Sequence, residues 1–101
     1  IELRLIKLDS RPAIVCDDIQ NLTITGLNFN SSIDANSIIA FNNVSHGTVQ
    51  SSKIYSAAKL FLEVKGNQSK KIYVHNNVLS GIKKVIENKS NIKVVEFGNI
   101  K

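Results

Sequence analysis

Apolar and polar residues alternate in several short segments, among them Leu22-Thr23-Ile24, Ile72-Tyr73-Val74 and Ile92-Lys93-Val94. Residues i and i+2 of a β-strand face the same side, so this alternation predicts strands with one apolar face. The chain also contains 14 Ile, 9 Val and 12 Asn residues. Branched side chains favour strands, and Asn tolerates the left-handed backbone of tight corners. We therefore predict an all-β protein of short strands joined by tight corners.

The strand segments recur along the chain. Four of them align at successive offsets of 25, 25 and 20 residues, namely 21–24, 46–49, 71–74 and 91–94. The 25-residue step also relates Phe29, Ile54 and Leu79, then Ile14, Ile39 and Val64, then Ile19 and Val44. Such a period predicts stacked coils of a parallel β-helix, which bury one continuous apolar column. The repeats lack the Leu-x-x-Leu-x-Leu spacing of leucine-rich repeats, and a β-sandwich does not require equivalent residues at this interval.

The coils predict which side chains point inward and which point outward. One interior row is expected to contain Ile24, Val49, Val74 and Val94, and one outward column Thr23, Thr48, Tyr73 and Lys93. Gly47 stands at an inward position where other repeats carry a large residue, which indicates a local gap or bend. Further apolar walls are expected from the segments 13–16, 38–41, 60–64 and 85–87. Asn pairs at 42–43 and 76–77 fall where strands should turn, and Asn side chains can hydrogen bond along such corners.

The predicted fold is a right-handed parallel β-helix of about four coils, with the handedness taken from the family resemblance described below. Residues 1–101 form a single segment, in which 1–8 end a preceding coil and the coils cover about 12–34, 35–56, 57–80 and 81–101. Residues 55–65 could instead form a short helix, because Ala57, Ala58, Leu60 and Phe61 allow one. Four coils with open strand edges at both ends would be marginally stable, so we expect a portion of a longer solenoid.

Charge is unevenly distributed along the chain. The net charge is +5, with three basic and five acidic residues in 1–52, and ten Lys and three Glu in 53–101. A basic half attracts polyanions, although lysines also protect strand edges from pairing. Nucleic acid is not expected as a partner, because only Arg4 and Arg11 are arginines and both lie in the acidic half. No apolar run is long enough to predict a membrane span, and the single cysteine, Cys16, is predicted to be buried.

One stretch resembles a known family. Arg11-Pro12-Ala13-Ile14-Val15, followed by Asp17-Asp18-Ile19-Gln20-Asn21-Leu22-Thr23-Ile24-Thr25-Gly26-Leu27, is similar to a late coil of polygalacturonase-like proteins. These are relatives of glycoside hydrolase family 28 within the pectate-lyase-like superfamily of right-handed parallel β-helices. The resemblance implies a secreted protein, extracellular or periplasmic, that acts on plant or acidic polysaccharide.

The catalytic signatures of that family are not intact in this chain. Asp17-Asp18 follows Cys16 instead of Gly, Ser45-His46-Gly47 differs from Gly-His-Gly at its first position, and Arg4-Leu5-Ile6-Lys7 contains an extra residue. We therefore assign no catalytic residue and expect this segment alone to be inactive. Adjacent Asp residues on a strand would face opposite sides and could not both flank one glycosidic bond. We interpret Asp17 and Asp18 instead as residues that close a corner by hydrogen bonding to backbone N–H groups.

The best candidates for ligand contact belong to the outward column or lie near it. They are Lys53, Tyr73, His75 and Lys93. Sugars stack on aromatic rings and accept hydrogen bonds from Lys, and an acidic sugar favours the basic half. The alternative is an ordinary solvent-facing sheet. His46 and His75 lack the neighbouring ligands that a metal site needs, so we expect no metal and no cofactor.

Two functional hypotheses remain open from the sequence. In the first, the chain is the C-terminal part of a polygalacturonase-like hydrolase, whose upstream coils carry the active site. In the second, it is a non-catalytic β-helix module for binding or assembly, for example in a surface or tail-fibre protein. The expected partners are a polysaccharide, together with the upstream coils of the same protein or further copies of the chain.

Overall fold

A computed structural model describes residues 2–3, 14–30 and 37–100, and in these residues the secondary structure consists of strands and turns without a helix. The ten strands are β1 (Glu2–Leu3), β2 (Ile14–Asp17), β3 (Gln20–Thr25), β4 (Asn28–Asn30), β5 (Ser37–Asn42), β6 (Ser45–Gln50), β7 (Lys53–Lys65), β8 (Lys70–His75), β9 (Val78–Asn88) and β10 (Val94–Phe97). The all-β prediction is thus confirmed. The short helix considered for 55–65 is not formed, because this segment is part of strand β7.

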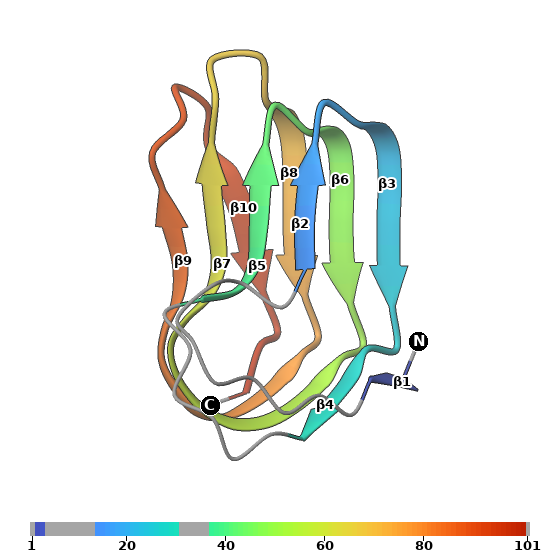
Figure 1. Ribbon diagram of the computed structural model, residues 1–101, viewed down its shortest axis with the longest axis vertical. Helices are drawn as coiled ribbons and strands as arrows, with labels where there is room; N and C mark the ends of the chain where they lie inside the picture. The colour runs from blue at the N-terminus through green and yellow to red at the C-terminus, as the bar shows by residue number, and fades with distance from the viewer. Residues whose placement is uncertain (1, 4–13, 31–36, 101) are drawn as a thin grey trace.

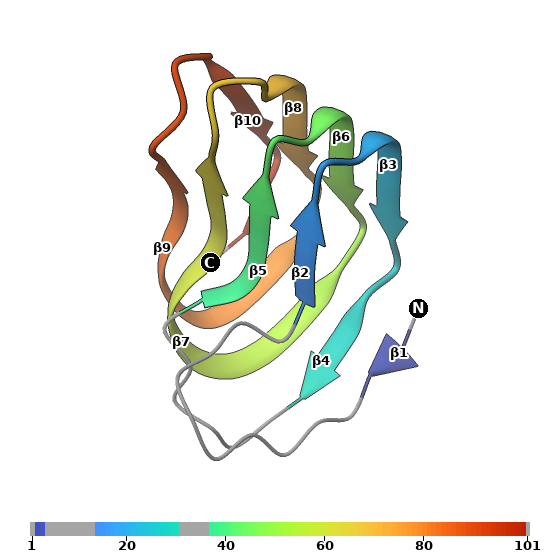
Figure 2. The ribbon, with the colours of Figure 1, turned by 45° about the horizontal axis from the view of Figure 1, so that its top comes forward.

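The strands form two parallel sheets (Figure 1). One sheet has the order β1-β4-β7-β5-β2, with β9 paired to β7, and the other has the order β10-β8-β6-β3. The long strands β7 and β9 curve, so that β7 pairs with β4 through its first residues and with β5 through its last. Figure 2 shows the strands of both sheets stepped one behind another, with a corner joining each pair. The predicted strand at 1–8 lies outside the described residues except for β1, which pairs with β4.

The register of the four-stranded sheet confirms most of the predicted interior row. Ile24 pairs with Val49 and Val49 pairs with Val74, and all three side chains are buried. The fourth member was predicted wrongly, because Val94 pairs with Ile72 instead of Val74. The last strand is therefore displaced along β8 from the predicted alignment. A pattern of alternating residues does not distinguish two registers that differ by two, since both keep the same side chains inward.

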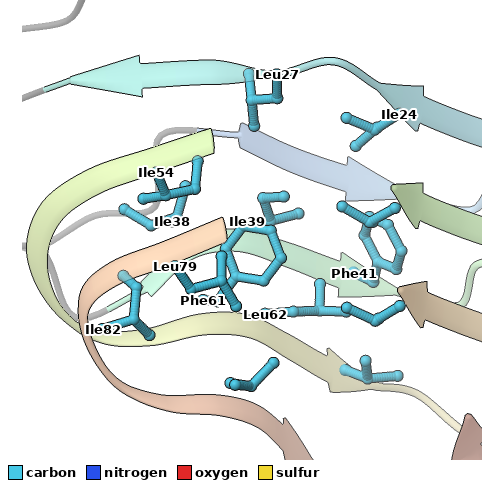
Figure 3. Packing of buried hydrophobic residues seen from close by; sticks show 14 of the residues in the cluster. Ile24, Leu27, Ile38, Ile39, Phe41, Ile54, Phe61, Leu62, Leu79 and Ile82 are labelled. Carbon is cyan, nitrogen blue, oxygen red and sulfur yellow. The ribbon is translucent and has the colours of Figure 1, made fainter. Parts of the chain in front are cut away.

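The six-stranded sheet supplies the opposite walls of the core. Phe29 pairs with Ile54 and Ile54 with Leu79, as the regular step predicts. Ile14 pairs with Ile39 as expected, but Ile39 then pairs with Leu62, and Val64 pairs with Phe41. Our placement of Val64 was wrong because the step from β5 to the end of β7 is shorter than the step from β2 to β5. Figure 3 shows side chains of this sheet in one apolar cluster with Ile24 of the four-stranded sheet, among them Ile39, Ile54, Leu62 and Leu79. The same cluster contains Cys16.

Gly47 stands at an inward position. Neighbouring side chains occupy the space that a larger side chain at this position would need. A Cβ atom at Gly47 would lie 2.9 Å from Val44 Cγ1, 3.1 Å from Ile72 Cδ1 and 3.2 Å from Phe41 Cε2. The gap predicted from the sequence is therefore filled by three fully buried side chains, those of Val44, Ile72 and Phe41. A methyl group at this position would therefore require the neighbouring side chains to shift.

The corners are built from residues with left-handed backbone. Positive φ angles recur in three columns. Two lie at corners, at Asp18, Asn43 and Gly66 and at Gly26, Ser51, Asn76 and Gly98, and the third lies at the second strand residues Asn21, His46 and Lys71. Asp and Asn adopt this conformation more readily than other side chains. Asp18 is therefore a corner residue, as predicted, and its N–H donates to Asn42 O at 2.9 Å. Asp17 is instead the last residue of strand β2, because the corner begins one position later than expected.

Two asparagines, the buried Asn77 and the partly buried Asn99, connect successive corners. Asn77 is fully buried, and its Oδ1 accepts a hydrogen bond from Ser52 N at 3.0 Å, while its Nδ2 donates to Val49 O at 3.2 Å. Asn99 repeats this arrangement one layer later, donating to Val74 O at 3.1 Å and accepting from Asn77 Nδ2 at 2.9 Å. These bonds satisfy polar groups that water does not reach. They also fix the register of the last strand, because they hold Asn99 directly beside Asn77.

Candidate ligand-binding face

The outward side of the four-stranded sheet carries two columns of aligned side chains. The register places Thr23, Thr48, Tyr73 and Val95 in one column, and Thr25, Gln50, His75 and Phe97 in the next. Ile72 and Val74 point into the core, so Tyr73 and His75 project outward on either side of Val74. We call Tyr73, His75, Val95 and Phe97 the aromatic face.

Two rings of the aromatic face stack on each other, and two are exposed. His75 and Phe97 stack with their centroids 4.7 Å apart and their planes 5° from parallel. Tyr73 is 39% exposed and Phe97 is 52% exposed. Asn76 Nδ2 lies 3.0 Å from His75 Nδ1. This contact and the stack with Phe97 orient the imidazole ring on the outward side of the sheet.

The four predicted contact residues do not form one cluster. Tyr73 and His75 lie together on β8, as expected. Lys53 begins β7 and therefore belongs to the other sheet. Lys93 precedes β10, and Val95 occupies the place in the Tyr73 column that was predicted for Lys93. The error in the register of β10 explains this correction.

Because the register of β10 was predicted wrongly, Phe97 was not predicted as a contact residue, although it is the most exposed ring of the aromatic face. Phe97 pairs with His75 in the register of β8 and β10. The alternation in Val94-Val95-Glu96-Phe97 carried a signal for a strand, but the alignment had assigned the last strand to residues 91–94. A search for an Asn equivalent to Asn77 would have found Asn99, and with it the observed register.

The remaining candidate residues show structural roles. Cys16 is buried in the core, as predicted, and both desolvation and the neighbouring Asp17 carboxylate raise the pKa of its thiol. Across residues 14–30 and 37–100, no group of three or more His, Cys, Asp and Glu side chains is arranged to hold a metal ion.

Comparisons with known proteins give no information on the family or function of the chain. No family model, no curated protein and no solved structure matches the chain. Within the described residues, none of the secondary structure is a helix of the length and apolar character needed to cross a membrane.

Proposed function

We propose that the chain is a portion of a right-handed parallel β-helix, about four coils long, from a polygalacturonase-like glycoside hydrolase of the extracellular or periplasmic space. In this proposal the segment helps to hold an acidic polysaccharide, and other coils carry out the hydrolysis. The repeated parallel register and the ladder formed by Asn77 and Asn99 support the β-helix. In a β-helix each coil packs against its neighbours, so equivalent residues of successive coils lie beside one another.

The observation that carries the binding proposal is the aromatic face. Tyr73 and Phe97 offer exposed rings on which the apolar face of a sugar can stack. His75 adds an imidazole ring beside them, whose nitrogens can hydrogen bond with sugar hydroxyls. Lys70 and Lys71 are exposed at the start of the same strand and supply positive charge for the carboxylates of an acidic polymer.

The layered construction suits a polymer as ligand. Neighbouring strands lie about 4.8 Å apart, so a chain crossing the sheet meets an equivalent side chain at every layer. Thr48, Tyr73 and Val95 provide three such successive positions, and Gln50, His75 and Phe97 three more. We therefore expect the affinity to rise with the length of the polysaccharide until the polymer spans the face.

Truncating a ring of the aromatic face is expected to weaken polysaccharide binding. Tyr73→Ala or Phe97→Ala should each lower the affinity for polygalacturonate about fivefold, which corresponds to the loss of about 1 kcal/mol of ring stacking. Isothermal titration calorimetry would measure the change. Tyr55→Ala is a matched control, because Tyr55 is equally aromatic and 49% exposed but lies on β7 in the other sheet.

The proposal fails if Tyr73→Ala, Phe97→Ala and Tyr55→Ala all leave the affinity unchanged, or if the chain does not bind polygalacturonate at all. The chain by itself is not expected to cut the polymer, since no catalytic role is assigned to its residues. Release of reducing sugar from polygalacturonate by the purified chain would contradict that part of the proposal.

A second candidate function is assembly with further copies or coils. Within the described residues, β10 is an edge strand, and it carries exposed Val95 and Phe97, followed by exposed Ile100. Exposed strand edges with apolar side chains are ready sites for pairing with another chain. Sedimentation velocity separates the two functions. An assembly module would form larger species with rising concentration and lose them in Phe97→Ala, whereas Tyr73→Ala would weaken polysaccharide binding alone.

A further inference from the structure

A polar depression lies where β2, β5 and β7 pass into β3, β6 and β8. Its volume is about 530 Å³, and we call it the corner trough. Two columns bound it. One follows the corners through Asp18, Asn43 and Gln68, and the other follows the first strand residues Gln20, Ser45 and Lys70.

The trough exists because one corner is longer than the two corners that precede it along the chain. Two residues separate β2 from β3 and β5 from β6, but the four residues 66–69 separate β7 from β8. Figure 1 shows this longer corner rising above the others. Ser69 anchors this corner to the end of β7, because its Oγ donates a hydrogen bond to Lys65 O at 3.0 Å. The insertion thus forms a raised wall beside two regular corners.

Gly66 permits the close contact between the long corner and the one before it. Its φ is 99°, and a Cβ atom there would lie 2.8 Å from the Asn43 backbone N. Asn43 is in turn oriented from both sides, because its Nδ2 donates to Asp18 Oδ1 at 3.3 Å and its Oδ1 accepts from Gln68 N at 3.2 Å. The floor of the trough is therefore a connected row of polar groups.

The two ends of the trough carry opposite charges. Asp18 lies at one end and Lys70 at the other, two strand spacings apart, which is about 10 Å. Among the described lining residues, these are the one acid and the one base, and the others carry amides or a hydroxyl. This lining offers little for an apolar ligand to contact, and its one base, Lys70, lies away from Asp18 and is placed to pair with a carboxylate.

We infer that the corner trough is a second binding site, which takes a short acidic saccharide of about two sugar units. The carboxylate of the ligand lies against Lys70, and its hydroxyls hydrogen bond with the Asp18 carboxylate and the amides of Gln20 and Asn43. A carboxylate accepts through both oxygens, so Asp18 can bind a hydroxyl while it accepts from Asn43. The inference rests on the proposed function for the choice of acidic sugars, but the site is separate from the aromatic face.

The test is an NMR titration of the isotopically labelled chain with digalacturonate, with lactose as the neutral comparison. Digalacturonate is expected to shift the backbone amides of Asn43, Ser45 and Gln68, and lactose to shift them far less. Lys70→Gln should weaken digalacturonate binding about tenfold, because a charge-assisted hydrogen bond is lost. Lys83→Gln removes the same charge from an exposed position on β9 and should leave the affinity unchanged.

The map of shifted amides separates this inference from the proposed function. Shifts confined to Tyr73, His75 and Phe97 would overturn the corner trough and leave the aromatic face standing. Shifts confined to the trough would support the inference and count against the aromatic face as the site for short sugars. Equal weakening by Lys70→Gln and Lys83→Gln would overturn the inference, because it would indicate attraction by net charge alone. The absence of any shift would overturn the corner trough alone, because the aromatic face is tested separately with polygalacturonate and the ring substitutions.

Discussion

Replacing Phe41 with alanine is expected to lower the free energy of unfolding by about 3–5 kcal/mol, as for other fully buried aromatic residues. Phe41 is fully buried, and its ring lies in the space that Gly47 leaves open between two layers. A chain of this size has a total stability of about 5–15 kcal/mol. The substitution should therefore remove a large share of the stability, which urea unfolding followed by circular dichroism would measure.

The same contact predicts that a second substitution partly compensates for the first. Gly47→Val alone should cost about 1–3 kcal/mol, because its side chain would overlap Val44, Ile72 and Phe41. In the Phe41→Ala background the added side chain enters the vacated volume. The double variant should therefore be more stable than the sum of the single effects predicts, by about 1–2 kcal/mol.

Phe61 provides the control for this double-mutant cycle. Its side chain is also fully buried, but Phe61 is not among the three nearest contacts of a Cβ atom at Gly47. Phe61→Ala should cost as much as Phe41→Ala, while its effect should add to that of Gly47→Val. Additivity in both cycles would show that Phe41 does not fill the space beside Gly47.

The sequence predicted the regular part of the fold because the same strand pairing repeats itself along the chain. The rows from Ile24 to Val74 and from Phe29 to Leu79 follow from one constant step between paired residues. Gly47 could be recognised as an interruption, since it stands in a row of large side chains. What fills the gap could not be recognised, because Phe41 comes from the other sheet.

The register of the strands was predicted wrongly where the length of the repeat changes. The step becomes shorter between Ile39 and Leu62, and shorter again between Ile72 and Val94. Each change lies at a corner or bend, where insertions and deletions cost little and leave no periodic signal. Within such a repeat, alternation identifies the face of a strand but not its register.

The candidate sites depend on those irregular places, and for that reason they were only partly predicted. Tyr73 and His75 belong to a regular strand and were found. Phe97 was missed because it lies beyond the last change of step, and Lys93 was misplaced for the same reason. The corner trough was not predicted at all, since it arises from the longer corner beside Asn43.

The second large effect is expected at Asn77, whose buried side chain joins three layers. Asn77→Ala would leave Ser52 N and Val49 O without their partners in a region that water does not reach. Each unpaired group costs about 1–3 kcal/mol, so the variant should lose about 2–6 kcal/mol of unfolding free energy. Asn67→Ala, at an exposed corner residue, should change stability by less than about 0.5 kcal/mol.

Asn77→Asp separates the loss of a hydrogen bond from the loss of volume, because the two side chains have nearly the same shape. An ionised carboxylate still accepts from Ser52 N but faces Val49 O and Asn99 Oδ1 with no hydrogen to donate. Burial and these two oxygens should raise the pKa of the new carboxyl group in the folded state above about 3.9, its value in the unfolded chain. The protonated form donates a hydrogen bond, so it restores part of the ladder.

The sign of the pH dependence follows from that raised pKa. The folded state binds the proton more tightly than the unfolded state, so the stability of Asn77→Asp relative to the parent is highest at low pH. It should fall as pH rises through the folded-state pKa. Urea unfolding of both proteins at pH 4 and pH 7 would measure this difference. The exposed control Asn67→Asp should show a far smaller change between the two pH values. If Asn77→Asp were destabilised equally at both, its carboxyl group would not be held in the buried ladder that joins these layers.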